Sequence, residues 1–144
     1  MQTIGKYFLV FIMIMFIFSC PAMAEYKIIA NKSVNYQEID STTLQKIFLG
    51  KITVGNKKEK LIPVTLNQED SLKSFISDNL HMSPKKYSSW WAKAVFTGTG
   101  TPPKSFKDTK SLLEYIATTE GAISFVKNEE PLAEDVKQVL FKEE

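Results

Sequence analysis

Polar side chains gather just after two segments that have the pattern of strands, and their chemistry is that of ligand binding. Asn31 and Ser33 follow one such segment directly, and Asn67 and Ser71 follow another. Open α/β sheets bind ligands at the carboxyl ends of their strands. We therefore expect these four side chains to line one shared crevice, where amide and hydroxyl groups would hold a small polar ligand.

Charged residues surround the second of these groups. Glu69 and Asp70 fall in the first turn of an expected helix, and Lys73 follows one turn later. Carboxylates at this position stabilise a helix through its dipole, but they repel an incoming anion. Lys73 supplies a positive charge that can restore an anion site, so we include it among the expected ligand-binding residues.

The sequence contains no combination of residues that is typical of an enzyme or a metal centre. It has one histidine, His81, and one cysteine, Cys20. Neither a G-x-S-x-G elbow nor an H-E-x-x-H helix is present. We therefore expect a non-catalytic protein that has no metal site and no cofactor.

Arginine is absent, and all 18 basic residues are lysines. Arginine is the side chain that grips phosphate with a planar fork, so a bound anion would have to be held by Lys, hydroxyl, amide and backbone N–H groups. A lysine-rich genome is the alternative explanation of the same fact. The net charge is only +2, which predicts neither a nucleic-acid nor a membrane-surface partner.

Two further motifs have both a structural and a functional interpretation. The glycine-rich segment Thr97–Gly100 suggests a phosphate loop, but it follows the expected carboxyl end of a helix, where the dipole is negative. We therefore expect Gly98 to end that helix in the left-handed region. The adjacent Trp90 and Trp91 suggest a stacking platform, yet neighbours on a helix point about 100° apart. One ring is expected in the core and the other partly exposed.

The hydrophobic pattern predicts a sheet with helices packed on it. Expected helix caps are Asp40, Asn67, Ser83 and Asp108. The expected order is β-α-β-α-α-α-β-β, with strands at 26–30, 61–66, 122–126 and 136–141 and helices at 41–49, 68–80, 84–96 and 109–118.

Residues 1–24 have the pattern of a secretory signal peptide. A single lysine precedes the apolar run Tyr7–Phe18, and the small-residue motif Ala22-Met23-Ala24 follows. The run is shorter than the ~20 residues that span a membrane. We expect cleavage after Ala24, export to a bacterial periplasm, and one mature domain over 25–144. Lipidation at Cys20 and a retained anchor are the alternatives.

Three segments together resemble a known family. They read LQKIFLGKI (Leu44–Ile52), WAKAVFTGTGTPP (Trp91–Pro103) and GAISFV (Gly121–Val126). In this order and spacing they resemble the phosphate-type substrate-binding proteins of ABC transporters, and in particular the short periplasmic proteins of that kind. The resemblance implies an α/β fold equivalent to a single lobe of a type II periplasmic binding protein, with a central mixed sheet and packed helices.

The chain departs from the family's phosphate-binding loop. That loop has an Arg followed by Ser-Gly-Thr at a helix start. Ser71 matches the serine, whereas Asn67 stands where the Arg would be and Leu72 and Lys73 replace Gly and Thr. Full-length members enclose the anion between two lobes. The expected mature domain has room for one, so a homodimer would have to supply the second.

These observations leave two functional hypotheses. The first is a periplasmic solute-binding protein for phosphate or another small anion, which would serve an ABC permease. The second is a periplasmic accessory module that kept the fold, lost the ligand, and binds an envelope protein.

Overall fold

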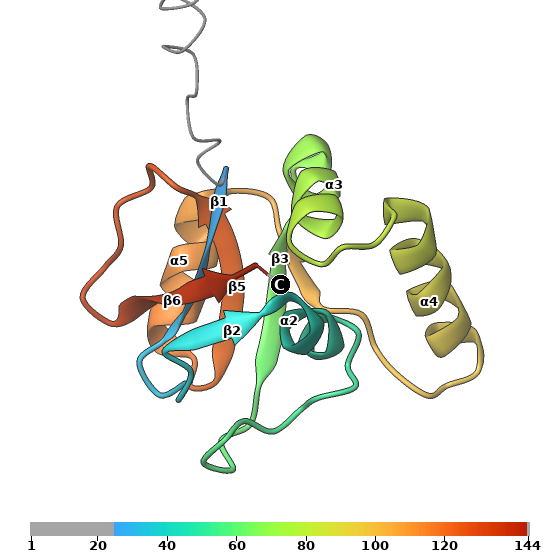
Figure 1. Cartoon of the computed structure of the whole chain (residues 1–144), viewed down its shortest axis with the longest axis horizontal. Coiled ribbons are helices and arrows are strands. Elements are labelled where there is room, and N and C mark those ends of the chain that lie inside the picture. The colour runs from blue at the N-terminus through green and yellow to red at the C-terminus, as the bar shows by residue number, and fades with distance from the viewer. Residues whose placement is uncertain (1–24, 144) are drawn as a thin grey trace, which may run out of the picture.

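The structure of this chain is a computed structural model that describes residues 25–143 (Figure 1). The predicted signal peptide, its cleavage site and the alternative lipid site at Cys20 therefore lie outside the described residues, and they stay predictions. No helix in the described range is long and apolar enough to cross a membrane.

A single mixed sheet forms the centre of the domain. Its strand order is β2-β6-β1-β5-β3-β4. β1 runs antiparallel to both β5 and β6, while β3 runs parallel to β4 and β5. The strands are β1 (Tyr26–Asn31), β2 (Glu38–Asp40), β3 (Ile62–Leu66), β4 (Lys104–Phe106), β5 (Ala122–Lys127) and β6 (Val136–Lys142).

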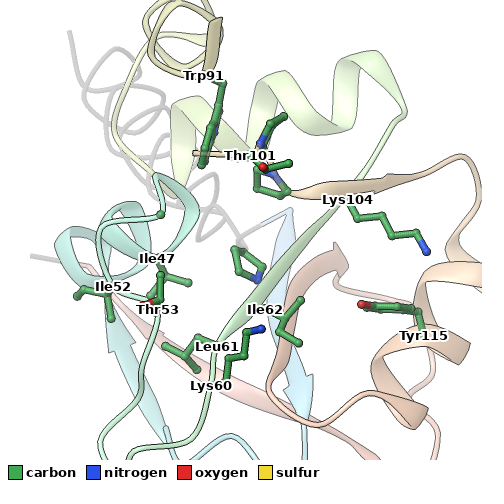
Figure 2. Close-up of a pocket in the computed structure, with 14 residues that line it drawn as sticks. Ile47, Ile52, Thr53, Lys60, Leu61, Ile62, Trp91, Thr101, Lys104 and Tyr115 are labelled. Carbon is green, nitrogen blue, oxygen red and sulfur yellow. The ribbon is translucent and has the colours of Figure 1, made fainter. Parts of the chain in front are cut away.

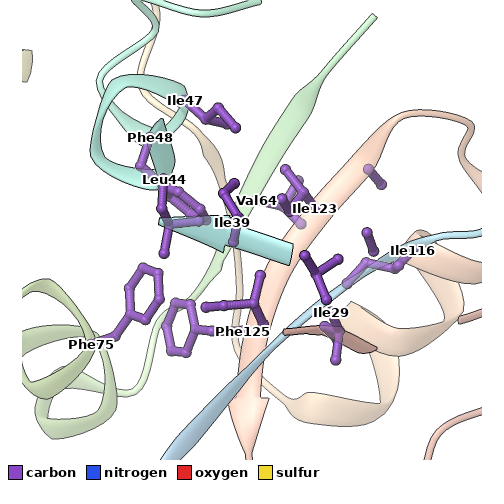
Figure 3. Close-up of a cluster of buried hydrophobic side chains, with 14 of the residues drawn as sticks. Ile29, Ile39, Leu44, Ile47, Phe48, Val64, Phe75, Ile116, Ile123 and Phe125 are labelled. Atoms are coloured by element: carbon purple, nitrogen blue, oxygen red, sulfur yellow. The ribbon is translucent and has the colours of Figure 1, made fainter. Parts of the chain in front are cut away.

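Helices pack on both faces of this sheet. Figure 3 shows Ile116 of α5 on one side of the strands and Leu44, Phe48 and Phe75 of α2 and α3 on the other. The rings of Phe75 and Phe125 stack with centroids 3.9 Å apart, and this contact joins α3 to β5. The helices are α2 (Ser41–Phe48), α3 (Glu69–Asp78), α4 (Pro84–Phe96) and α5 (Thr109–Thr118).

Three of the four predicted helix caps are confirmed. Asp40, Ser83 and Asp108 each accept a hydrogen bond from a backbone N–H three residues later. The cap predicted at Asn67 is wrong, because α3 begins one residue later and its N-cap, Gln68, makes no side-chain capping bond. α3 therefore begins without a side-chain cap and with two acidic residues, Glu69 and Asp70, in its first turn.

The structural interpretations of the two ambiguous motifs are also confirmed. Gly98 has a φ of 68° and follows the last turn of α4, so it ends that helix. Trp91 is 8% exposed and belongs to the core, whereas Trp90 is 38% exposed. The short strands β2 and β4 were not predicted, since three residues are too few for a recognisable alternation. α4 lies at the edge of the molecule, beyond α3 (Figure 1).

Candidate functional site

The predicted ligand-binding residues lie at two opposite ends of the strands of the sheet. β5 pairs antiparallel with β1 and parallel with β3, and Ile123 lies beside both Ala30 and Pro63. The end of β1 is therefore next to the start of β3. The prediction that Asn31, Ser33, Asn67 and Ser71 share one crevice is wrong, because β1 and β3 run in opposite directions.

Asn31 and Ser33 make structural hydrogen bonds at the end of β1. The amide nitrogen of Asn31 donates to the carbonyl oxygens of Ile116 and Ala117, at 2.8 and 3.1 Å, near the end of α5. Its amide oxygen accepts from the backbone N–H of Ser33 at 2.9 Å. The Ser33 hydroxyl in turn accepts from the N–H of Gly121 at 2.8 Å. These bonds fix the connection between α5 and β5.

Asn67 and Lys73 lie at the opposite end of the sheet, beside the carboxyl ends of the parallel strands β3 and β4. They line a pocket of about 430 Å³, which we call the strand-end pocket. Its polar base is formed by Thr65 and Ser105, whose hydroxyl oxygens are 3.3 Å apart. The full lining is Thr65, Asn67, Glu69, Leu72, Lys73, Ile76, Pro84, Tyr87, Ser88, Trp91, Pro102, Pro103 and Ser105.

Ser71 does not line the strand-end pocket. It is a buried residue on α3, whereas the next residue, Leu72, contributes to the pocket wall. The two side chains point about 100° apart on the helix. The position that carries the hydroxyl in the family's loop thus faces the protein interior here.

The charges that line the strand-end pocket cancel. Lys73 Nζ lies 2.7 Å from Glu69 Oε1, one helical turn apart. The hydrogen bond from Lys73 lowers the pKa of Glu69, and the same bond raises the pKa of Lys73. Both side chains are therefore ionised at neutral pH. No further charged residue lines the pocket, so it offers hydroxyl and amide groups within a nearly neutral setting.

Two aromatic side chains of α4 close one wall of the strand-end pocket. Burial raises the pKa of the Tyr87 hydroxyl to about 12, and the nearby Trp91 indole acts in the opposite direction. Tyr87 therefore keeps its proton as a donor. Trp91 Nε1 is buried, and the Tyr87 hydroxyl lies near it without full hydrogen-bond geometry.

A second pocket of about 530 Å³ lies beside the starts of β3 and β4. Figure 2 shows Ile47, Ile52 and Leu61 around it, and Lys104 extending towards Tyr115. Lys104 Nζ lies 4.9 Å from the centre of the Tyr115 ring and 5.0 Å from that of Phe106. Its ammonium group thus makes cation–π interactions with both rings. This pocket is at the wrong end of the strands for the ligand-binding rule of α/β sheets.

Sequence reasoning found two residues of the strand-end pocket and missed most of its polar groups. Thr65 looked like an ordinary strand residue, and Ser105 lies on the unpredicted β4. The one available signal was Pro102-Pro103, which forces an extended backbone just before Ser105. As to metals, no three His, Cys, Asp or Glu side chains between residues 25 and 143 gather as a ligand set.

Comparison with known proteins gives structural matches but no sequence matches. No family model and no curated protein matches the chain. A phosphate transport receptor of the ABC type from Vibrio cholerae matches with a TM-score of 0.60 at 13% identity, over 81% of this chain and 46% of the receptor. A candidate phosphate ABC transporter substrate-binding protein from Clostridium perfringens, solved with bound phosphate, matches with a TM-score of 0.62 at 11% identity, over 81% and 44%.

A possible phosphate binding protein from Planctomyces limnophilus gives the same result, with a TM-score of 0.58 at 10% identity over 83% of this chain and 42% of that protein. At such identities the matches establish the fold alone. The expected α/β fold, equivalent to roughly one lobe of a phosphate-type binding protein, is confirmed. The chain spans less than half the length of each of these solved structures.

Proposed function

We propose that this chain is a solute-binding protein and that its ligand occupies the strand-end pocket. The observation that supports this most directly is the position of the Thr65 and Ser105 hydroxyls, with Asn67, at the carboxyl ends of two parallel strands. This is the end of the strands at which α/β sheets bind ligands. The size of the pocket, about 430 Å³, suits a small molecule.

The ligand that fits this lining best is a small polar solute held by hydroxyl and amide groups. Phosphate or another small anion would bind well only if Lys73 left its ion pair with Glu69 and turned to the ligand.

Thermal unfolding with a panel of phosphate, sulfate and neutral polar solutes tests the proposal. A ligand at a hundred times its Kd stabilises by about 2.7 kcal/mol, which is roughly ten degrees for a domain of this size. We expect Ser105→Ala to reduce the shift by at least a third, because one hydrogen bond is worth about 1 kcal/mol, and Ser77→Ala, an exposed serine on α3, to retain it. No shift with any solute, or an equal shift in Ser105→Ala, would contradict the proposal.

The cellular setting is proposed on the same basis. The fold is that of periplasmic binding proteins, and the pattern of residues 1–24 predicts export. The mass of the protein recovered from the periplasmic and the membrane fractions tests this: a periplasmic chain that begins at Glu25 supports cleavage after Ala24, and a membrane-bound chain lipidated at Cys20 supports the alternative. An ABC permease as partner, and a homodimer that completes the cleft, are part of the transport hypothesis.

A second function is favoured by the surface of α4, which is unusually rich in exposed apolar side chains. Phe96 is 92% exposed and Val95 57%. Such side chains on an edge helix are typical of protein interfaces. The chain would then act as an interaction module in the cell envelope, with or without a solute in its pocket.

A further inference from the structure

A groove with basic walls and an aromatic floor lies on the side of α4 that faces α2. It encloses about 360 Å³ and is lined by Gln45, Leu49, Lys51, Met82, Lys86, Ser89, Trp90 and Lys93. We call it the basic groove. It shares no lining residue with the strand-end pocket, so a ligand in one is not required for a ligand in the other.

The basic groove is built by two segments that contain no acidic residue. No Asp or Glu occurs between Asp40 and Glu59 or between Asp78 and Asp108, although the chain has 16 of them. All of the lining residues fall within these two segments. The chain as a whole is nearly neutral, but its charge is segregated, and this face is positive.

Three lysines project into the basic groove without a carboxylate partner. Lys86 and Lys93 lie on one stripe of α4 with Trp90, at spacings of four and three residues. Lys51 comes from the segment after α2, and its ammonium group is 4.5 Å from the centre of the Trp90 ring. None of the three is in an ion pair with another residue of the described range. The charges of Lys86 and Lys93 are thus available to a ligand, while that of Lys51 lies against the Trp90 ring at the same groove.

Lys86 is placed against the electrostatic preference of its own helix. α4 has Lys85 and Lys86 in its first turn and no acidic residue there. The amino end of a helix carries a partial positive charge, so a cation in the first turn is unfavourable. The helix end also adds to the positive potential of the groove. A residue that costs its helix stability and projects into a groove is better explained by binding than by folding.

The floor of the basic groove is apolar and held in place. The Trp90 N–H donates to the carbonyl oxygen of Leu49 at 3.0 Å, and Gln45 Nε2 donates to the carbonyl oxygen of Leu80 at 2.8 Å. The ring of Trp90 is therefore fixed between α2 and α4 with one face partly exposed. Met82 adds a flexible apolar wall. This floor would accept one apolar side chain between the three charges.

We propose that the basic groove binds an acidic segment of a partner protein, whose carboxylates pair with Lys51, Lys86 and Lys93 while an apolar side chain rests on Trp90. A flat anionic membrane fits less well, because the groove is concave and Phe96 points about 120° away from Trp90 around α4. Nucleic acid fits less well because recognition of its phosphates needs a longer basic surface than three lysines supply.

The test uses protein purified from cells that express the full chain and a fluorescein-labelled nonapeptide, EEDLEDFEE, in a fluorescence anisotropy titration. We expect saturable binding that weakens at least tenfold between 50 and 500 mM NaCl, because its charge pairs are exposed to solvent. The peptide EEDSEDSEE, which keeps the charge and lacks the apolar side chains, should bind at least fivefold more weakly.

Matched charge variants separate the groove from the general charge of the protein. Lys86→Gln with Lys93→Gln should weaken peptide binding at least tenfold and leave the Tm unchanged or slightly higher. Lys85→Gln with Lys110→Gln removes the same charge from exposed positions outside the groove, and it should retain binding. Equal loss in both pairs, no binding of EEDLEDFEE, or stronger binding of an oligothymidylate or of anionic phosphatidylglycerol vesicles would overturn the proposal.

Discussion

The indole N–H of Trp90 donates a hydrogen bond of 3.0 Å to the carbonyl oxygen of Leu49. Leu49 is the C-cap of α2, where carbonyl groups have no partner within the helix. The bond therefore ties the edge helix α4 to a helix of the core. It also fixes the ring that forms the floor of the basic groove.

Replacing Trp90 by Phe should remove this tie and keep most of the ring. The loss of one hydrogen bond costs about 1 kcal/mol, which is a fall in Tm of about 4 °C for a domain of this size. Thermal unfolding measures it. Phe96→Ala, on the same helix but 92% exposed, is the control and should leave the Tm unchanged. If the two variants behave alike, the bond contributes nothing to stability.

Replacing Gly121 by Ala should be far more damaging than the same change at Gly98. Both glycines have positive φ, 81° and 68°. A Cβ at Gly121 would collide with the carbonyl oxygen of Lys60, whereas a Cβ at Gly98 meets nothing. We expect a loss of about 4 kcal/mol or a failure to fold for Gly121→Ala, and about 1 kcal/mol for Gly98→Ala. Denaturant unfolding gives both values, and similar losses would show that only the backbone angle matters.

The local features of this fold could be predicted from the sequence because each depends on a few neighbouring residues. Asp40, Ser83 and Asp108 are caps whose partners lie three residues away. Gly98 ends α4 because the residue after a helix C-cap commonly has a positive φ, which glycine adopts easily. The direction of β1 relative to β3 is different in kind, because it depends on β5, whose Ile123 pairs with Ala30, 93 positions earlier, and with Pro63, 60 positions earlier.

This non-local pairing decides which of the predicted site residues lie together in one pocket. Asn67 and Lys73 follow β3 closely, so they reach the strand-end pocket whatever the rest of the sheet does. Asn31 would reach the same crevice only if β1 and β3 were parallel, and they are antiparallel. Ser105 was missed because its strand is only three residues long and pairs with a partner 40 positions earlier.

Replacing Asn31 by Asp should show that this residue acts in folding rather than in ligand binding. The carboxylate would face the carbonyl oxygens of Ile116 and Ala117 with no proton to donate. We expect a loss of about 3 kcal/mol at neutral pH. The pKa of the new carboxyl would be raised in the folded state, so the loss should shrink below about pH 4 and grow as the pH rises.

Ser33→Ala is the control for that variant, because it removes only the acceptor of the Gly121 N–H. It should cost about 1 kcal/mol at every pH. Chemical unfolding of both variants between pH 3 and 8 makes the comparison. A loss in the Asn31 variant that does not change with pH would contradict the orientation of the amide.

Asp40 should make stability depend on acid pH in the opposite sense. Hydrogen bonds from the Thr43 N–H and hydroxyl lower the pKa of its carboxyl below the usual value of 3.8. The stabilisation is thus present above that value and is lost as the pH falls through the lowered pKa of the folded state. Asp40→Ala should cost about 1 kcal/mol at pH 7 and much less near pH 2. Glu114→Ala, which removes no capping bond, should show no such difference; a gap that persists at pH 2 would mean that packing rather than charge is responsible.

Replacing Glu69 by Gln should reveal whether the strand-end pocket can bind anions. The wild-type side chain pairs with Lys73 at 2.7 Å and cancels its charge beside the pocket. Without that carboxylate, Lys73 is free to turn to a bound oxyanion, and a source of repulsion is removed. We expect phosphate affinity to rise roughly three- to tenfold at low salt, as Coulomb's law gives for one charge removed at a few ångströms.

Asp70→Asn is the matched control, because it makes the same change of charge one residue later on α3 without lining the pocket. Isothermal titration calorimetry with phosphate on the two variants and the wild-type protein distinguishes the cases. A rise confined to the Glu69 variant means that the pocket is an anion site held in check by its own carboxylate. Equal affinities in all three proteins mean that the charge of Glu69 does not affect binding in the pocket. The ligand must then be sought among neutral polar solutes, for which Thr65, Asn67 and Ser105 already supply hydrogen-bonding groups.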